Sequence, residues 1–239
     1  MKKNIFLIII SFCLLTNFLK AQAQSIDQTF RPVISAGLTG SQIDGDNAGG
    51  YKHLSYYLGV GINRQLSRII ELEFALTFLQ KGARSNYRTD SASLNNPNNP
   101  FTLIRLNYLE VPLCLKIRYK RFKAEVGGAF AFLVENPPYD RDQNGIVPPN
   151  LVGKYQDFDF SALIGCGYKL SPNVWINLRS EYSMAPVRPY PAASGGVYRG
   201  ILHGLFNKGF YNNVVMLTLN YILPSKSSGT SAPVTPNGQ

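Results

Sequence analysis

After its first twenty-odd residues, the chain repeats a rhythm of alternating apolar and polar residues in eight segments. The clearest segment runs from Ile70 to Phe78, where Ile, Leu, Phe, Leu and Phe alternate with Glu, Glu, Ala and Thr. Side chains alternate between the two faces of a strand, so such a segment has one apolar face and one face that can hold charge. This suits a wall with lipid on one side. The rhythm therefore predicts an all-β chain that forms an eight-stranded antiparallel transmembrane β-barrel.

The lengths of the connections support this architecture. The expected strands cover residues 31–42, 53–63, 69–80, 105–119, 122–134, 157–170, 174–184 and 210–223. The short connections are residues 64–68, 120–121 and 171–173, and the long ones are 41–52, 81–104, 135–156 and 185–209. Short and long connections alternate, as in bacterial outer-membrane barrels with tight periplasmic turns and longer external loops. We therefore expect the protein in the cell outer membrane, with both ends of the barrel domain in the periplasm.

Two terminal segments differ from the barrel in composition. Residues 1–23 have a basic start, an apolar run from Ile5 to Leu15 and the small-residue pair Ala21 and Ala23, which predict a cleaved signal peptide. The run is too short for a spanning helix, which needs about 20 apolar residues. The barrel domain is expected over residues 24–223, and the low-complexity residues 224–239 are expected to be a disordered tail.

The charge and the cysteines exclude several classes of function. Loss of residues 1–23 removes three lysines and no acid, so the formal charge falls from +10 to +7. An exported chain meets no nucleic acid, and no basic run exceeds the pair Lys120-Arg121. Two cysteines remain, Cys114 and Cys166, which we place two strands apart and on opposite faces, so they should not form a disulfide. No cysteine–histidine spacing suggests a metal site.

Assigning the two faces of each strand predicts what fills the barrel. The lipid-facing set includes Leu54, Tyr56, Leu58, Val60, Ile62, Leu109, Val111, Leu113, Leu115, Ile117, Val215, Leu217, Leu219 and Tyr221. The opposite face carries Glu71, Glu73, Glu110, Lys116, Arg118, Lys123, Glu125, Arg179 and Glu181, together with small residues such as Gly165. Buried charges persist only when they are paired, so we predict an ion-paired network that plugs the lumen. A barrel of eight strands is just wide enough for side chains to fill.

Aromatic residues near the strand ends are candidates for the two interfacial girdles of a membrane barrel. The set is Tyr56, Phe78, Tyr108, Tyr119, Phe122, Phe132, Tyr168, Tyr182, Phe210 and Tyr221.

Two stretches carry a resemblance to a known family. They are LQKGA at residues 79–83 and LNYLEVPLCLK at residues 106–116. Together they resemble the signature of the PorT-like outer-membrane β-barrel family of Bacteroidota. The resemblance implies an eight-stranded outer-membrane barrel, and the founding branch of that family is tied to type IX protein secretion. Pro112, inside the second stretch, is expected to mark a bulge or a gap in strand pairing, because proline lacks a backbone N–H.

Candidate chemistry is weak. Residues 140–145, DRDQNG, match the first half of a calcium loop, but Leu151 stands where the pattern needs a bidentate glutamate, and a polar loop tip explains the residues as well. His53 and His203 fall near external loops with Ser55 and Ser194 available, yet no catalytic motif surrounds them. We predict no catalytic, cofactor-binding or metal-binding residues and no cofactor.

Three functional hypotheses follow. The first is a non-enzymatic outer-membrane barrel that contacts outer-membrane lipid and an envelope or secretion-system protein. The second is a soluble periplasmic barrel that carries a small molecule in an apolar lumen, as lipocalins do. The third is an outer-membrane barrel enzyme. Five lumen-facing carboxylates disfavour the second hypothesis, because they are incompatible with an apolar cargo.

Overall fold

The computed structural model describes residues 30–45, 50–84, 102–135, 139–142, 145–146, 155–189 and 209–224. The expected signal peptide, residues 1–23, lies outside the described residues. So does the expected tail, residues 224–239, apart from Pro224. Among the described residues, no helix is long and apolar enough to cross a membrane.

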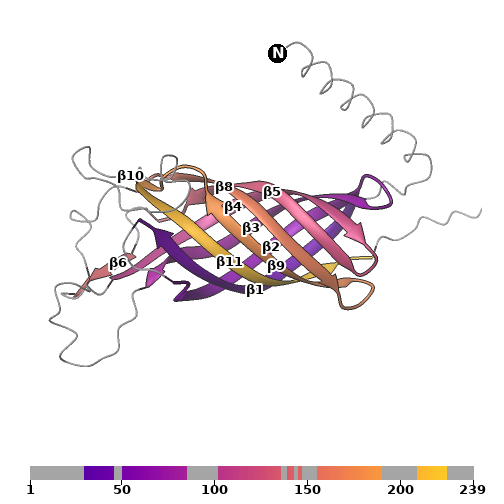
Figure 1. The fold of residues 1–239 in the computed structure, drawn as a ribbon, viewed down its shortest axis with the longest axis horizontal. Helices are drawn as coiled ribbons and strands as arrows, with labels where there is room; N and C mark the ends of the chain where they lie inside the picture. The colour runs from indigo at the N-terminus through magenta and orange to yellow at the C-terminus, as the bar shows by residue number, and fades with distance from the viewer. Residues whose placement is uncertain are drawn as a thin grey trace, which may run out of the picture.

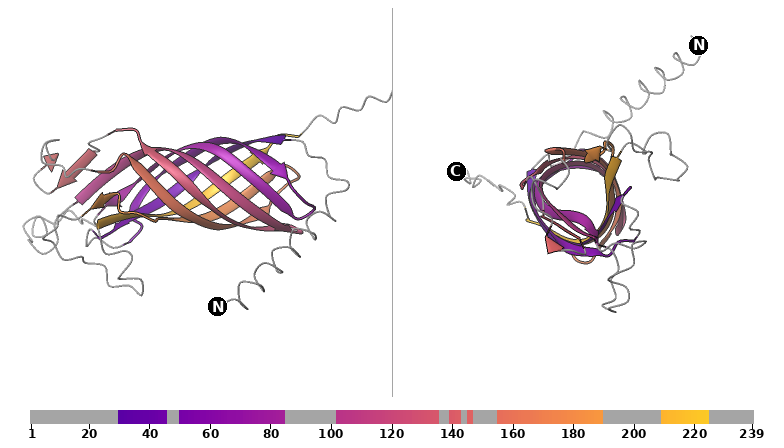
Figure 2. Two further views of the ribbon diagram at one scale, coloured as in Figure 1. Left: turned by 90° about the horizontal axis from the view of Figure 1, so that it is seen from above. Right: turned by 90° about the vertical axis from the view of Figure 1, so that its left-hand side faces the viewer.

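Eight long strands form a closed antiparallel barrel (Figures 1 and 2). They are β1 (Phe30–Asp44), β2 (His53–Gln65), β3 (Ile70–Arg84), β4 (Thr102–Tyr119), β5 (Phe122–Leu133), β8 (Phe158–Lys169), β9 (Val174–Ser183) and β11 (Gly209–Ile222). Each strand pairs with the next, and β11 pairs with β1, so the sheet has no free edge along the wall. The view along the axis shows the resulting ring. The predicted fold class is confirmed, since every expected strand corresponds to one of these eight.

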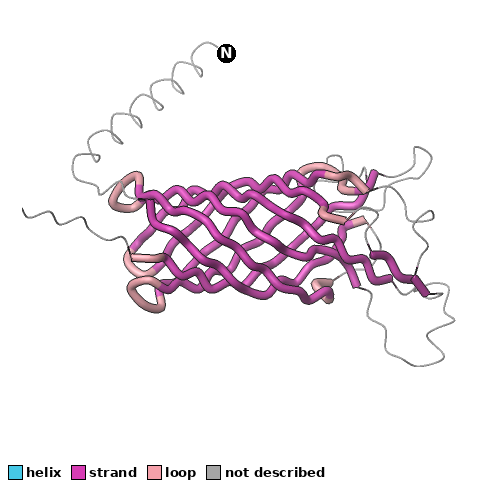
Figure 3. The backbone as a smooth tube through the Cα atoms, turned by 180° about the vertical axis from the view of Figure 1, so that it is seen from behind, coloured by secondary structure: helices cyan, strands magenta, loops and turns pink. Residues whose placement is uncertain are grey.

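Three short strands lie in connections that the sequence predicted to be long loops. β6 (Tyr139–Asp142) pairs with the start of β4 and with β7 (Gly145–Ile146), and β10 (Arg188–Pro189) pairs with β11. The short connections all lie at the end of the barrel where β1 begins and β11 ends (Figure 3). The predicted alternation of short and long connections is confirmed, with additional strand pairing inside two of the long ones.

Pro112 interrupts the pairing of β3 with β4. The register runs from Ile70 opposite Ile117 to Phe74 opposite Leu113, then resumes with Thr77 opposite Glu110. The two parts keep the same offset, so no residue is inserted and the feature is a gap without a bulge. On its other side, Pro112 stays in register with Ala129 of β5. The missing N–H therefore costs pairing with one neighbour only.

The outer face of the wall is apolar, as the alternation predicts. Leu54 is 80% exposed and Leu38 68% exposed, and all the lipid-facing residues expected from β2 are exposed in the chain on its own. In a soluble barrel this apolar surface would be exposed to water, whereas in a membrane the bilayer covers it. The two cysteines are free and lie on opposite faces, with Cys114 buried and Cys166 exposed, which confirms the expectation that they do not pair.

Tyr108 corrects the aromatic assignment. Its place near a strand end predicts an interfacial girdle, but it is buried inside the barrel. The reason is the period of the strand: Tyr108 lies two residues from Glu110 on β4, so both side chains point to the lumen. Tyr119 and Phe122 do face outward, as expected.

The external half of the interior holds an apolar cluster. It consists of Ile43, Tyr57, Leu79, Ala83, Ile104, Leu106, Tyr108, Ala131, Leu133, Tyr155, Val214 and Met216, all at most 2% exposed. Nearer the periplasmic end, Val33, Trp175 and Ile222 form a smaller cluster. Buried charged side chains share the lumen with these clusters, and Lys81 lies between Leu79 and Ala83 of the larger one on the inward face of β3.

Candidate functional site in the barrel interior

Two groups of buried charged residues lie in the lumen. The Arg179 cluster, in its middle and periplasmic part, contains Arg179 (β9), Lys116 (β4), Glu73 (β3) and Glu125 (β5). The Lys81 cluster, nearer the external end, contains Lys81 (β3), Glu110 (β4), Asp159 (β8) and Glu181 (β9). Every member projects from the inward face of its strand, so the alternation places them together. These clusters are the predicted ion-paired network.

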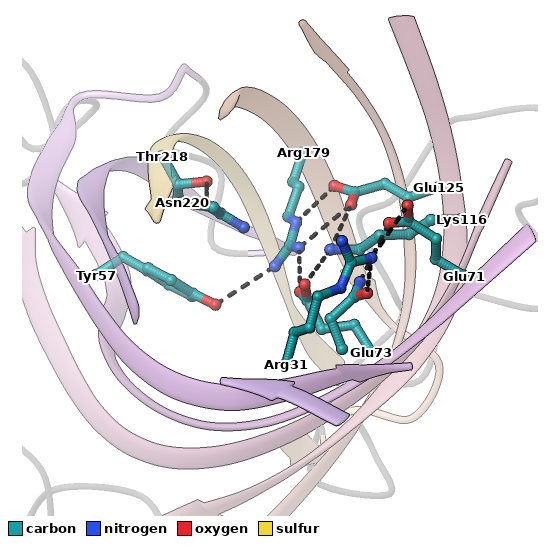
Figure 4. A network of polar contacts seen from close by, with 10 residues as sticks. Arg31, Tyr57, Glu71, Glu73, Lys116, Glu125, Arg179, Thr218 and Asn220 are labelled. Atoms are coloured by element: carbon teal, nitrogen blue, oxygen red, sulfur yellow. Dashed lines mark hydrogen bonds and ion pairs between the residues drawn. The ribbon is translucent and has the colours of Figure 1, made fainter. Parts of the chain in front are cut away.

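Arg179 joins the strands around it through a fork of hydrogen bonds (Figure 4). Its Nε donates to Glu125 Oε1 at 2.6 Å and its Nη2 donates to Glu125 Oε2 at 3.2 Å. Nη2 also donates to Glu73 Oε1 at 3.1 Å, and Nη1 donates to the Tyr57 hydroxyl at 3.4 Å. Lys116 pairs with Glu73 and lies 3.6 Å from Glu125 Oε2. Two cations thus face two carboxylates, and each carboxylate has two cationic partners.

A glycine makes room for this cluster. A Cβ added to Gly165 of β8 would lie 2.6 Å from Glu125 Oε1 and 2.8 Å from the Leu178 carbonyl oxygen. Any larger residue would displace the carboxylate from Arg179. The small inward-facing residue expected at this position therefore has a specific packing role.

Glu71 closes the network at the periplasmic end. Its Oε1 lies 2.9 Å from Arg118 Nη1 and 3.8 Å from Arg31 Nη2, and its Oε2 accepts a hydrogen bond from Asn63 at 3.2 Å. The two arginine side chains are about one-quarter exposed, whereas the glutamate is buried. This site ties β1, β2, β3 and β4 together.

The Lys81 cluster has a different composition, because one ammonium group serves three carboxylates. Lys81 Nζ lies 3.1 Å from Glu110 Oε2 and 3.2 Å from Asp159 Oδ2, and it also pairs with Glu181. All four side chains are at most 1% exposed. Nζ lies 5.1 Å from the centre of the Tyr108 ring, and Asn212 Nδ2 donates to Asp159 Oδ2 at 2.9 Å. The cluster therefore holds two more carboxylates than cations.

Sequence reasoning missed two members of this cluster. The sequence pattern places Lys81 in the loop after the third strand, and the lumen-facing set that it predicts does not contain Asp159. β3 continues to Arg84 and β4 begins at Thr102, so Lys81 lies within the wall. The spacing was informative: Lys81 continues the odd-numbered series that includes Glu71 and Glu73, and Asp159 shares its face with Ser161 and Gly165.

The two signature stretches meet in the structure. Gln80 pairs in register with Asn107, and its Nε2 donates to Asn107 Oδ1 at 2.8 Å. Lys81, from the first stretch, contacts Tyr108 and Glu110, from the second. The residues that carry the family resemblance therefore hold β3 and β4 together from both faces of the sheet, a structural role.

His53 pairs with a serine that the sequence did not single out. Ser41 Oγ lies 3.2 Å from His53 Nδ1 and donates to the Gly82 carbonyl oxygen at 3.0 Å, and both side chains are buried. The serine hydroxyl thus bridges the imidazole and a backbone carbonyl. The pair fastens β1 to β2 and β3. Ser55 lies elsewhere, donating to Gln80 Oε1 at 3.4 Å.

The other candidates cannot be placed as sites. Residues 140–142 and 145 lie in the β6–β7 hairpin, of which the structure describes the strand pairing but not the side chains. Gln143 and Asn144 are outside the described residues. His203, Ser194 and Leu151 are outside them too. Within the described part of the chain, no group of three or more His, Cys, Asp or Glu residues is arranged to hold a metal ion.

Comparison with solved structures finds similar chains at low sequence identity. Neisserial surface protein A is 11% identical, with 80% of this chain and 97% of that chain covered and a TM-score of 0.45. Ail, the attachment invasion locus protein of Yersinia pestis, is 13% identical, with 81% and 98% covered and a TM-score of 0.40. OprG from Pseudomonas aeruginosa is 13% identical, with 82% and 96% covered and a TM-score of 0.37. A search of curated sequences finds no match.

The sequence itself matches a family model over most of its length. Residues 21–187 match the outer membrane protein beta-barrel domain, a region that contains seven of the eight barrel strands. The apolar outer wall, the closed ring and the charged interior agree with this match. The chain therefore belongs to the outer membrane protein beta-barrel domain family, and its place is the outer membrane.

Proposed function

We propose that this protein is a non-enzymatic outer-membrane barrel whose lumen is closed to solutes and which acts by contacting an envelope protein. The observation that carries the proposal is the burial of the interior charges. Lys81, Arg179, Glu125 and Glu110 are at most 2% exposed, and two apolar clusters fill other parts of the same lumen. A hydrated ion crossing the lumen would have to break these pairs and enter an apolar region, which is costly.

Measuring ion conductance through the barrel tests directly whether its lumen is closed. Purified full-length protein in a planar lipid bilayer is expected to give no steady single-channel steps, with an open porin as positive control in the same bilayer. Glu125→Gln identifies the route of any current, because this side chain lies in the lumen. Steady steps from the unmodified protein whose cation selectivity changes in the Glu125→Gln variant would contradict a closed lumen.

The interior also supports a role without catalysis. Ser41 and His53 are both buried, and the serine hydroxyl also donates to the Gly82 carbonyl oxygen, which fits a link between strands. The soluble-carrier alternative has no support, because its lumen would be apolar and its outer wall polar, the reverse of the arrangement here. We therefore expect the contact with an envelope protein at one of the two ends of the barrel.

A photo-cross-linking residue tests the contact with an envelope protein. Lys52, in the external β1–β2 connection, and Ser171, in the β8–β9 turn, are exposed and lie at opposite ends. Leu217, on the outer wall, is the matched control because lipid covers it. We expect a discrete protein adduct at Lys52 or Ser171 in intact cells and none at Leu217. No adduct at either end would contradict the proposal.

A link to type IX protein secretion is the finer version of this proposal, supported by the two signature stretches. These residues fasten β3 to β4, so what supports the link is shared architecture and not a shared docking surface. Deletion of the gene is expected to lower the amount of secreted cargo in the culture medium, with recovery on complementation. Unchanged cargo secretion would remove the link and leave the barrel proposal intact.

A further inference from the structure

The periplasmic end of the barrel is strongly basic on its outside. Its three short connections span residues 66–69, 120–121 and 170–173, and they contain Arg68, Lys120 and Arg121 but no acid. Lys169 ends β8 beside them, and Arg64 lies at the end of β2. Glu71, the acid nearest this end in β3, is buried and paired with Arg31 and Arg118. Arg68, Lys120 and Arg121 are therefore exposed cations in connections that contain no carboxylate of their own.

Three of these cations lie against aromatic residues of the outer wall. Lys120 Nζ is 5.4 Å from the centre of the Tyr119 ring, and Arg121 Nη1 donates to the Tyr168 hydroxyl at 3.4 Å. Arg64 lies 5.1 Å from the centre of the Phe30 ring. Tyr119 and Phe30 are exposed on the wall. These three positive charges are thus held beside aromatic residues of the outer wall, an arrangement typical of side chains near lipid headgroups.

Two adjacent turns, residues 120–121 and 170–173, border an open hollow next to Lys120 and Arg121. It has a volume of about 340 Å³ and is lined by Lys120, Arg121, Lys169, Leu170, Ser171 and Pro172. The backbone N–H of Lys169 donates to the Arg121 carbonyl oxygen at 2.8 Å, which ties the two turns together. Lys120 has a φ of 55°, a left-handed conformation that costs a lysine about 1 kcal/mol. The turn therefore presents a lysine at a position where glycine would be less strained.

We propose that this hollow binds the phosphate of an anionic phospholipid in the periplasmic leaflet. Lysine and arginine are the side chains that bind phosphate oxygens, as a point charge and as a planar fork of donors. Three cations without an acid favour a headgroup with net negative charge, because the amine of a zwitterionic headgroup would be repelled. Leu170 and Pro172 supply an apolar edge for the glycerol backbone.

Native mass spectrometry of the full-length protein tests the proposal. The protein is released from mixed micelles that contain equal amounts of phosphatidylglycerol and phosphatidylcholine. We expect at least tenfold greater retention of phosphatidylglycerol, since a basic residue near a membrane surface contributes roughly fivefold in affinity. The triple variant Lys120→Gln, Arg121→Gln, Lys169→Gln should lose this preference. A matched control, Lys52→Gln, Arg84→Gln, Arg105→Gln, removes three charges at the external end and should keep it.

Each other outcome overturns the proposal. Equal retention of both lipids, or an unchanged preference in the triple variant, would show that the hollow does not select lipid. Equal loss in the control variant would show that net charge alone attracts the lipid. Displacement of phosphatidylglycerol by millimolar inorganic phosphate would identify a free-phosphate site. Co-sedimentation with purified peptidoglycan that depends on the same three residues, without lipid selectivity, would identify an acidic polymer as the occupant.

Discussion

The Arg179 and Lys81 clusters lie in one lumen but differ in how many cationic partners compensate each buried carboxylate. In the Arg179 cluster, two cations face two carboxylates, and each carboxylate keeps a partner if one cation is removed. In the Lys81 cluster, Glu110, Asp159 and Glu181 depend on a single ammonium group. Equal burial therefore does not mean equal tolerance, because the redundancy of partners decides how much one substitution exposes.

The surroundings increase this difference. Tyr108, which covers Lys81, belongs to the apolar cluster together with Leu79 and Leu106. Asp159 Oδ1 and Glu181 Oε2 have no hydrogen-bond partner among the described residues, so the lysine is the main source of compensation for these groups. The Arg179 fork, in contrast, satisfies both oxygens of Glu125. The Lys81 cluster is therefore the more vulnerable region.

Lys81→Met should have the largest effect. It leaves three buried carboxylates without a cation, and breaking one buried pair already costs about 3–5 kcal/mol. We expect a loss in the free energy of unfolding at or above 5 kcal/mol at neutral pH, measured by urea unfolding in detergent micelles. Acidification should restore part of the stability lost, because protons then neutralise the carboxylates.

Lys52→Met is the control for this substitution, since Lys52 is exposed in a connection. It should leave the unfolding free energy within about 0.5 kcal/mol of the unmodified protein. A Lys81→Met protein as stable as this control would mean that the three carboxylates do not depend on the lysine.

Arg179→Met should have a smaller effect. Glu73 and Glu125 lose the guanidinium fork, but Lys116 remains beside both carboxylates. We expect a loss of about 3 kcal/mol, the lower end of the range for a broken buried pair. The same urea titration checks it. A loss larger than that of Lys81→Met would overturn the idea that redundant partners protect the Arg179 cluster.

The alternation of the sequence predicts most of this interior and explains where prediction failed. Glu73, Lys116, Glu125 and Arg179 were placed correctly, because side chains two residues apart share a face in any strand. Lys81 was missed because glycine and polar residues after Gln80 resemble a loop, although Gly82 continues the strand with a φ of 151°. Where β3 ends depends on its pairing with β4, which residues 79–84 alone do not reveal.

Which lumen charges pair could not be predicted from alternation. It depends on the stagger between strands that close the barrel, and this places Lys81 of β3 against Asp159 of β8 and Glu181 of β9. The lumen-facing set predicted from the sequence has nearly equal numbers of carboxylates and bases. The structure divides the charges into one balanced cluster and one cluster with excess carboxylates. A sum over the sequence contains no information on how charge divides along the axis.

The smallest and most discriminating prediction removes a carboxylate from each cluster. Glu125→Gln should cost about 2 kcal/mol, because it replaces a charged acceptor of the Arg179 fork with an amide that bonds arginine less strongly. Glu110→Gln should be neutral or stabilise by about 1 kcal/mol, because Lys81 keeps Asp159 and Glu181 while repulsion among the carboxylates falls. The two substitutions are chemically identical and both sites are buried, so the difference in urea midpoint reports local charge balance alone. Equal destabilisation by both would show that Glu110 is needed as a charged partner, and that the Lys81 cluster gains enough from three carboxylates to offset their repulsion.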